Sequence, residues 1–209
     1  IGPEHQSRLA ALLEPLRGKI PNAVFSKPFE NPVGGDNTKM RANFREALRL
    51  LKEAGWSLQG NRLLNDKTGE PFTIDYIDYS PIGERYVLPF QSNLQRIGIK
   101  IDYRMLDSSA YEARVRKFDF DMIGTVWGES LSPGNEQREY WGASSANREG
   151  SRNYAGIADP AVDALIDKVI FASDRASLIT ATHALDRVLL ANHFVIPQWY
   201  SRDDRYVYW

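Results

Sequence analysis

The sequence predicts an α/β fold with a mostly parallel sheet and flanking helices. Residues 72–77 and 99–103 are short apolar runs typical of strands, and residues 83–97 between them have the pattern of a helix. A strand–helix–strand unit of this length is typical of a crossover between parallel strands. A helix over 108–116 then leads to a third apolar run at 120–126. If the sheet follows the flavodoxin-like order, 72–77 lies between the other two strands.

Residues 1–36 are expected to form an N-terminal helix followed by an extended connection. Leucines recur at helical spacing over residues 4–17, which predicts one apolar helix face. The stretch after them is rich in Pro, Asn and Gly and is typical of exposed chain. The leucines of the predicted face are Leu9, Leu12, Leu13 and Leu16.

A second helix is predicted between Asn37 or Thr38, either of which can cap its first turn, and Gly55, which follows its last turn. Two short apolar runs, 56–58 and 62–64, then flank a Gly-containing turn and predict a small hairpin. The apolar stripe of the helix consists of Met40, Phe44, Ala47, Leu48 and Leu51.

The segment 127–158 is polar and unusually long for a connection. Loops of this length in a compact domain are usually functional or disordered, and we interpret this one as a long ligand-facing loop. Asp159, which precedes a proline, and Asp174 predict the starts of two further helices. Residues 195–200 and 205–209 are expected to be extended.

Composition limits the classes of protein that fit. A chain of 209 residues can build a substantial core, and we expect residues 1–209 to form one lobe. The balance of 26 Lys and Arg against 27 Asp and Glu argues against a nucleic-acid partner. No apolar run approaches the ~20 residues of a membrane span, so no membrane insertion is predicted. The lack of cysteine excludes disulfides, thiolate catalysis and cysteine-bound zinc.

The two ends of the sequence suggest a piece of a longer protein. Ile1 is preceded by neither an initiator methionine nor a signal-like segment, and Trp209 lies inside an aromatic, strand-like run. We therefore expect a fragment.

The histidines do not predict a metal centre. His5, His183 and His193 are scattered, and the last two are ten positions apart, which is not a ligand spacing on one helical turn. We interpret all three as ordinary surface or interface residues and predict no metal and no cofactor.

Carboxylate chemistry is also weakly indicated. Asp119, Asp121 and Glu129 are the local candidates, but a hydrolytic pair needs two convergent carboxyl groups ~5–10 Å apart. Solvated or capping roles suit the two aspartates better. No nucleophile elbow, P-loop or dinucleotide fingerprint is present, so no catalytic residue and no enzyme activity is predicted.

The candidate ligand-binding residues lie after two predicted strands and in the long loop. In open α/β sheets, ligands bind beyond the carboxyl ends of the strands. Aromatic faces together with amide, hydroxyl and charged groups suit a polar, zwitterionic ligand. By contrast, Tyr140 and Trp141 are expected to plug the core. The predicted ligand-binding residues are Tyr79, Ser80, Trp127, Gly128, Glu129, Ser130, Ser132, Asn135, Arg138, Arg152 and Asn153.

Several segments together resemble one family. Residues 47–56 read A-L-R-L-L-K-E-A-G-W, 91–99 read Q-S-N-L-Q-R-I-G-I, and 153–166 read N-Y-A-G-I-A-D-P-A-V-D-A-L-I, with Ile-Pro at 196–197. In this order they resemble the peptide/nickel-binding family of extracytoplasmic receptors of ABC importers. Residues 127–137, W-G-E-S-L-S-P-G-N-E-Q, resemble its Yej-type branch, which is associated with microcin-C-like peptides and peptidoglycan fragments.

The resemblance implies the C-terminal lobe of a class II periplasmic-binding-protein fold. Such a receptor encloses an oligopeptide between two lobes and delivers it to permease subunits, so the implied partners are the peptide, the permease and an N-terminal lobe. The implied location is periplasmic, or extracytoplasmic at the cell surface. In better-known members the tryptophan matching Trp127 is followed three positions later by an aspartate that holds the peptide amino terminus. Here that position is Ser130, preceded by Glu129.

Two interpretations from other classes stay open at the level of sequence. One is a lobe of a carboxylate-based hydrolase that uses Glu129 with Asp119 or Asp121, and turnover of ligand would distinguish it. The other is a non-catalytic protein-interaction domain, which would lack saturable affinity for peptide.

Overall fold

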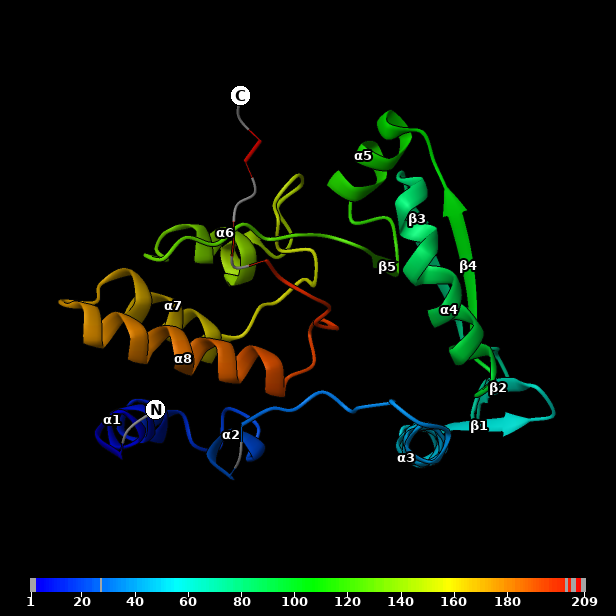
Figure 1. The fold of residues 1–209 in the computed structure, drawn as a ribbon, viewed down its shortest axis with the longest axis horizontal. Helices are drawn as coiled ribbons and strands as arrows, with labels where there is room; N and C mark the ends of the chain where they lie inside the picture. The colour runs from blue at the N-terminus through cyan, green and yellow to red at the C-terminus, as the bar shows by residue number, and fades with distance from the viewer. Residues whose placement is uncertain (1–2, 27, 202, 204–205, 208–209) are drawn as a thin grey trace. The chain divides into compact units, whose positions relative to one another are not determined.

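The computed structural model describes residues 3–26, 28–201, 203 and 206–207, and the chain divides into two compact units. One unit is continuous and spans Glu30–Gly128, and the other combines Ile1–Phe29 with Glu129–Trp209 (Figure 1). Each unit has a core of its own. The segment 127–158, expected to be one loop, is therefore shared between the units, and a single lobe over 1–209 stays a prediction.

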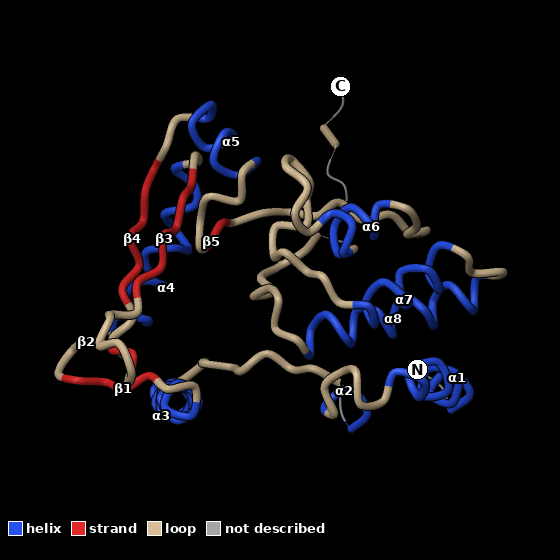
Figure 2. The backbone as a smooth tube through the Cα atoms, turned by 180° about the vertical axis from the view of Figure 1, so that it is seen from behind, coloured by secondary structure: helices blue, strands red, loops and turns tan. Residues whose placement is uncertain are grey.

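The unit Glu30–Gly128 contains a three-stranded parallel sheet. Its strands are β3 (Thr73–Asp78), β4 (Lys100–Met105) and β5 (Met122–Ile123), in the order β4-β3-β5. Tyr76 pairs with Tyr103 on one side and with Met122 on the other. The predicted central position of the 72–77 strand is therefore confirmed, and Figure 2 shows β3 and β4 running side by side.

The third strand is much shorter than expected. The run 120–126 was predicted as a buried strand, but only Met122 and Ile123 pair with β3. A side chain at the next residue, Gly124, would meet the hydroxyl groups of two tyrosines, and Val126 is 80% exposed. The residues after Ile123 therefore leave the sheet, and the predicted strand was wrong for 120–121 and 124–126.

Helices connect the strands, and the two faces of the sheet differ. The connections contain α4 (Glu84–Gln95), which follows the 3₁₀ turn η2 (Pro81–Gly83), and α5 (Ser108–Arg116). Asp107 accepts hydrogen bonds from Ser109 and Ala110 and caps α5, as predicted. On the face covered by α4, Val87 packs with Tyr76 and Ile101. Because side chains alternate along a strand, Asp75 points to the other face.

A charged network centred on Asp75 joins the sheet to α5. Arg114 donates from Nη2 to Asp75 Oδ2 and from Nε to Asp119 Oδ2, and both hydrogen bonds are 2.8 Å long. Arg104 Nε lies 2.9 Å from Asp75 Oδ1. The backbone N–H of Asp75 donates to Asp121 Oδ2 over 2.8 Å. The hydrogen bond with Asp75 is the main cause of a raised pKa of Arg114. The network thus fixes α5 and the start of β5 against the central strand.

A helix and a hairpin complete this unit. α3 (Asn37–Glu53) packs beside the antiparallel strands β1 (Trp56–Gln59) and β2 (Arg62–Asn65), which confirms the predicted hairpin. The cap of α3 was placed one or two residues too late, at Asn37 or Thr38, since Asp36 accepts from the backbone N–H of Lys39. Gly98, at φ +81°, is required because a Cβ there would lie 2.5 Å from the backbone nitrogen of Leu63. The core residues here are Leu63, Ile97 and Ile99.

The other unit is helical over its described residues. Its elements are α1 (Pro3–Leu13), η1 (Glu14–Leu16), α2 (Ala23–Ser26), α6 (Glu136–Trp141), η3 (Ala143–Ser145), α7 (Pro160–Ile170) and α8 (Arg175–Ala191). Asp159 and Asp174 cap α7 and α8 as predicted. The first helix ends at Leu13, earlier than expected, where a 3₁₀ turn containing Pro15 begins.

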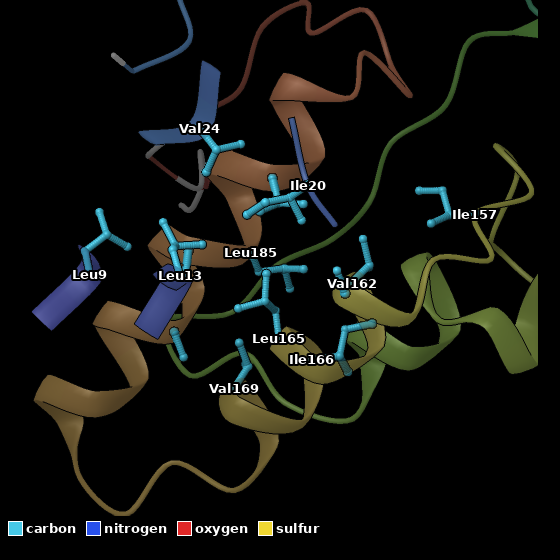
Figure 3. Close-up of a cluster of buried hydrophobic side chains, with 14 residues drawn as sticks. Leu9, Leu13, Ile20, Val24, Ile157, Val162, Leu165, Ile166, Val169 and Leu185 are labelled. Carbon is cyan, nitrogen blue, oxygen red and sulfur yellow. The ribbon is translucent and has the colours of Figure 1, made fainter. Parts of the chain in front are cut away.

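One apolar cluster holds this helical unit together. Leu13, Leu165 and Leu185, from α1, α7 and α8, are among its buried members (Figure 3). Tyr140 is buried and Trp141 packs against the cluster, which confirms their predicted place in the core. Residues 195–200 form no regular strand, and Arg205, Tyr208 and Trp209 lie outside the described residues. No helix within 3–26 and 28–201 is long and apolar enough to cross a membrane.

Replacing Asp75 by Ala is expected to lower the free energy of unfolding by about 1–3 kcal/mol, because it leaves the partly buried Arg114 with half of its ion pairs. Urea denaturation measures the change. The matched control is Arg49→Ala, since Arg49 pairs with Glu46 and Glu53 at an exposed position, and a loss within about 0.5 kcal/mol is expected there. Equal losses in both variants would contradict a structural role for the network.

Candidate ligand-binding site

A buried carboxylate organises the carboxyl end of the central strand. Asp78, the last residue of β3, is 7% exposed. Its Oδ1 accepts hydrogen bonds from the backbone N–H groups of Tyr79 and Ser80, over 2.7 and 3.0 Å, and its Oδ2 accepts from the hydroxyl of Tyr103 over 3.1 Å. Burial and this hydrogen bond raise the pKa of Tyr103. The chain that leaves β3 is therefore held in one conformation.

Gly83 is a consequence of this arrangement. A Cβ at this position would lie 1.8 Å from Asp78 Oδ2, so no side chain fits while the carboxylate keeps its place. The sequence D-Y-S-P-I-G at 78–83 therefore encodes a compact turn between β3 and α4. The turn positions Tyr79 and Ser80 directly after the strand.

The predicted residues of this unit follow two neighbouring strands. Tyr79 is 52% exposed and Ser80 is half-buried, both at the end of β3. Trp127, half-buried, and Gly128, exposed, follow β5 after a short unpaired segment. Because β3 and β5 are parallel, both segments leave the sheet at its carboxyl edge. This is the edge where ligands bind in open α/β sheets.

In the helical unit, Glu129 is held by a residue that was not among the candidates. Gln137, on α6, is 5% exposed, and its Nε2 donates to Oε1 and Oε2 of Glu129 over 3.0 and 2.9 Å. Glu136 accepts from the backbone N–H of Gly134 over 2.7 Å and lies beside the same amide. A single buried amide thus orients the carboxylate of Glu129.

The surroundings of Glu129 change its acidity. Partial desolvation raises the pKa of Glu129, while the hydrogen bonds from Gln137 and the charge of Arg152 oppose this shift. Arg152 is itself fixed, since it donates to the hydroxyl of Tyr140 over 3.1 Å and its guanidinium lies 4.8 Å from the centre of that ring. The charge of Arg152 therefore acts on the carboxylate of Glu129.

The remaining candidates of this unit are not all brought together. Ser130 and Ser132 are exposed, and Ser130 Oγ accepts from the backbone N–H of Ser132 over 3.1 Å. Asn135 is exposed just before α6. Arg138 donates to Asp167 on α7 over 2.7 Å, so its contacts join α6 to α7 and it is not hydrogen-bonded to Glu129.

Asn153 is a structural residue of the loop. Its side chain is 0% exposed, and its amide donates to the carbonyls of Gly142 and Ile157 and accepts from the N–H of Ile157, over 2.9 to 3.0 Å. These hydrogen bonds join the side chain of Asn153 to backbone groups in the interior, and the side chain has no contact with solvent. We therefore remove Asn153 from the ligand-facing set, which corrects the sequence-based prediction for this residue.

Three residues that hold or contact the candidates were not in the predicted ligand-binding list. Asp78 carried a usable signal, since an aspartate at a strand end followed by Tyr-Ser-Pro is typical of a side chain that accepts from the next backbone groups. Gln137 carried none, because one glutamine in a polar loop is indistinguishable from a solvated residue. Tyr111, whose ring centre lies 4.8 Å from that of Tyr79, is separated from it in sequence by a helix and a strand.

The other candidate chemistries find little support. At the amino end of β5, Asp119 accepts a hydrogen bond from Arg114, and Asp121 accepts one from the backbone N–H of Asp75. Both aspartates therefore have structural partners, which argues against their use as a hydrolytic pair. His5 and His183 meet between α1 and α8, with ring nitrogens 2.9 Å apart, which makes them interface residues. No group of three or more potential metal ligands occurs among the residues that the structure describes.

Comparison with known proteins identifies the family. A family model described as bacterial extracellular solute-binding proteins, family 5 Middle, matches residues 11–149. The chain belongs to this family. It is 52% identical over 197 residues to an uncharacterized Sinorhizobium fredii protein, y4wM, and 48% identical over 198 residues to the probable peptide-binding protein YejA of Agrobacterium fabrum. It is 33% identical over 193 residues to the peptidoglycan-binding protein YepA of Agrobacterium fabrum.

The matches cover nearly the whole chain but only part of each relative. The three relatives are covered over 30%, 32% and 31% of their own length, against 94%, 95% and 92% of this chain. The chain thus spans about a third of these proteins. The family is one of solute-binding proteins and not of enzymes, in agreement with the sequence-based interpretation.

Solved structures confirm the fold class. The oligopeptide-binding protein AppA of Bacillus subtilis, solved with a nonapeptide, matches 91% of this chain with a TM-score of 0.61 at 20% identity, over 38% of AppA. A periplasmic oligopeptide-binding protein of an ABC transporter from Thermotoga maritima matches 95% of the chain with a TM-score of 0.64 at 19% identity, over 41% of that chain. The α/β fold of the periplasmic binding proteins, predicted from sequence, is therefore confirmed.

Asn153→Ala is expected to cost about 1–3 kcal/mol of unfolding free energy, because it leaves buried backbone groups of Gly142 and Ile157 without partners. The matched control is Asn135→Ala at an exposed position, where a change within about 0.5 kcal/mol is expected. Chemical denaturation followed by circular dichroism distinguishes the two. Full stability in the Asn153 variant would return this residue to the list of possible ligand contacts.

Proposed function

We propose that this chain is the C-terminal, ligand-contacting lobe of a solute-binding protein that captures oligopeptides for an ABC importer. The observation that carries the proposal is the carboxyl edge of the parallel sheet. Exposed aromatic and polar groups follow β3 and β5 there, at the edge where α/β proteins bind ligands. The 48% identity to a probable peptide-binding protein supports the choice of peptide.

The proposed mechanism is capture without chemistry. A second lobe, contributed by another part of the same protein, would close on the ligand and bury most of its surface. The closed receptor would then be the form recognised by the permease subunits of the importer. The extracellular character of the family supports a periplasmic or cell-surface location for the protein.

Glu129 is the proposed anchor for the amino terminus of the peptide. An ionised carboxylate only accepts hydrogen bonds and has about four lone-pair sites, whereas Gln137 contributes a single nitrogen, shared between both oxygens. Acceptor capacity is therefore left for an ammonium group. The family resemblance leads us to expect an aspartate at position 130, where this chain has Ser130. Glu129, one position earlier, supplies a carboxylate in its place.

The anchor predicts a specific pH dependence. With the protein that contains this chain, calorimetric titration is expected to give tighter binding of tetra-alanine than of N-acetyl-tetra-alanine. Because the pKa of Glu129 is raised, this preference is expected to weaken as the pH falls through that raised value, where the carboxylate becomes neutral. Glu129→Gln is expected to remove the preference and its pH dependence at a cost of about 1.5–3 kcal/mol in binding.

The control for this experiment is Glu70→Gln, which removes an exposed carboxylate from the hairpin region and is expected to bind as the wild type does. A Glu129→Gln variant that keeps the preference for the free amino terminus would remove Glu129 from the anchor role. If the wild type bound none of a set of free oligopeptides, peptide capture itself would be refuted.

Trp127→Ala is expected to weaken peptide binding by about 1–3 kcal/mol, the range for truncating a good aromatic anchor at an interface. Isothermal titration with tetra-alanine measures the change, and Trp56→Phe, in the hydrophobic cluster beside the hairpin, serves as an aromatic control with unchanged affinity. An unaltered dissociation constant in the Trp127 variant would exclude this residue from the site.

A further inference from the structure

Two tyrosines form a pair at the carboxyl edge of the sheet. Tyr79 follows β3 directly, and Tyr111 lies on α5, which follows β4. Their ring centres are 4.8 Å apart with planes inclined by 45°. Since β3 and β4 are parallel neighbours, both rings come from segments that leave the same edge.

Tyr79 is more exposed than the tyrosines within the strands, whereas Tyr111 is half-buried. Tyr76 is buried, and Tyr103 is half-buried beneath α4, where both pack in the apolar cluster with Val87. Tyr79, by contrast, lies after the end of β3 and is 52% exposed. A tyrosine face offers apolar area together with a polar rim, which suits stacking on a flat ring.

The position of Tyr79 is fixed by the interior of the unit. The carboxylate of Asp78 accepts hydrogen bonds from the N–H of Tyr79 and from the hydroxyl of Tyr103. Gly83, which has no side chain, leaves the space that this carboxylate occupies. The backbone that carries the exposed ring is therefore ordered before any ligand arrives. Pre-ordering reduces the entropy that binding would otherwise cost.

We propose that Tyr79 and Tyr111 form an aromatic platform that packs against a ring of the ligand, and that Asp78 is the positioning residue that orders it. The ring is either an aromatic side chain of a peptide, through its π face, or a sugar ring of a peptidoglycan fragment, through the apolar face formed by its C–H groups, since both suit contact with an aromatic ring. This inference rests on the proposed function, because it assigns a specificity element to the same ligand site.

The test compares probes with and without a ring. The protein that contains this chain is titrated with tetra-alanine, with Ala-Ala-Phe-Ala, and with a muramyl peptide that carries a sugar ring. The variants are Tyr79→Ala, Tyr111→Ala and Tyr79→Phe. Leu88→Ala is the control, because Leu88 is an exposed apolar residue of α4 in the same unit.

The platform predicts a loss that depends on the ring. Each alanine variant is expected to lower affinity for at least one ring-bearing probe by roughly three- to tenfold, the value of an aromatic pair, and to leave tetra-alanine unchanged. Tyr79→Phe keeps the ring and is expected to bind as the wild type does. The probe that loses affinity identifies the ring as an aromatic side chain or a sugar.

Asp78 is tested through the ratio of the affinity for a ring-bearing probe to the affinity for tetra-alanine. Asp78→Asn keeps an oxygen that accepts from the backbone and is expected to retain the preference for a ring, whereas Asp78→Ala is expected to lose it. A merely structural role would lower stability, which thermal denaturation reports, without changing the ratio in the folded protein.

Four results would overturn the inference in whole or in part. Equal losses for all probes would make the tyrosines general contacts, and unchanged affinities would place them outside the site. Equal ring preference in Asp78→Ala and the wild type would remove the positioning role. A wild type that binds none of the probes would refute the proposed function as well, and is thereby distinguished from a failure of the platform alone.

Discussion

The central position of β3 between two parallel neighbours is the constraint on which the sheet unit depends. Pairing with β4 and β5 brings the carboxyl ends of all three strands to one edge, so segments far apart in sequence present their side chains together. The parallel arrangement requires long crossovers, which α4 and α5 provide. Without this parallel pairing, Tyr79 and the chain after β5 would not leave the sheet at the same edge.

Two aspartates of the same strand stabilise this arrangement in different ways. Asp75 points to the face opposite Tyr76 and binds Arg104 and Arg114, so its charge is neutralised by groups from β4 and α5. Asp78 ends the strand and is satisfied mainly by the backbone that follows it. Removing carboxylates from water is costly unless they are paired or hydrogen-bonded. Asp75 therefore stabilises the packing of the sheet, and Asp78 orders the chain at its carboxyl edge.

Local signals in the sequence predicted much of the fold and less of the site. The caps at Asp107, Asp159 and Asp174 were predictable because each depends on a few consecutive residues. The strand at 120–126 was overestimated because apolar, β-branched composition does not show where pairing with β3 begins and ends, and only Met122 and Ile123 pair. The role of Asn153 was missed because its partners, Gly142 and Ile157, are defined only by the folded loop. Side-chain pairs such as Glu129 with Gln137 depend on tertiary structure in the same way.

The most direct test of this account is a crystal structure of the protein that contains this chain, determined with a bound oligopeptide. The account predicts that ligand atoms contact Tyr79 and Trp127 at the carboxyl edge of the sheet. A ligand bound instead at the amino edge, beside Asp119 and Asp121, or bound away from the sheet, would contradict it.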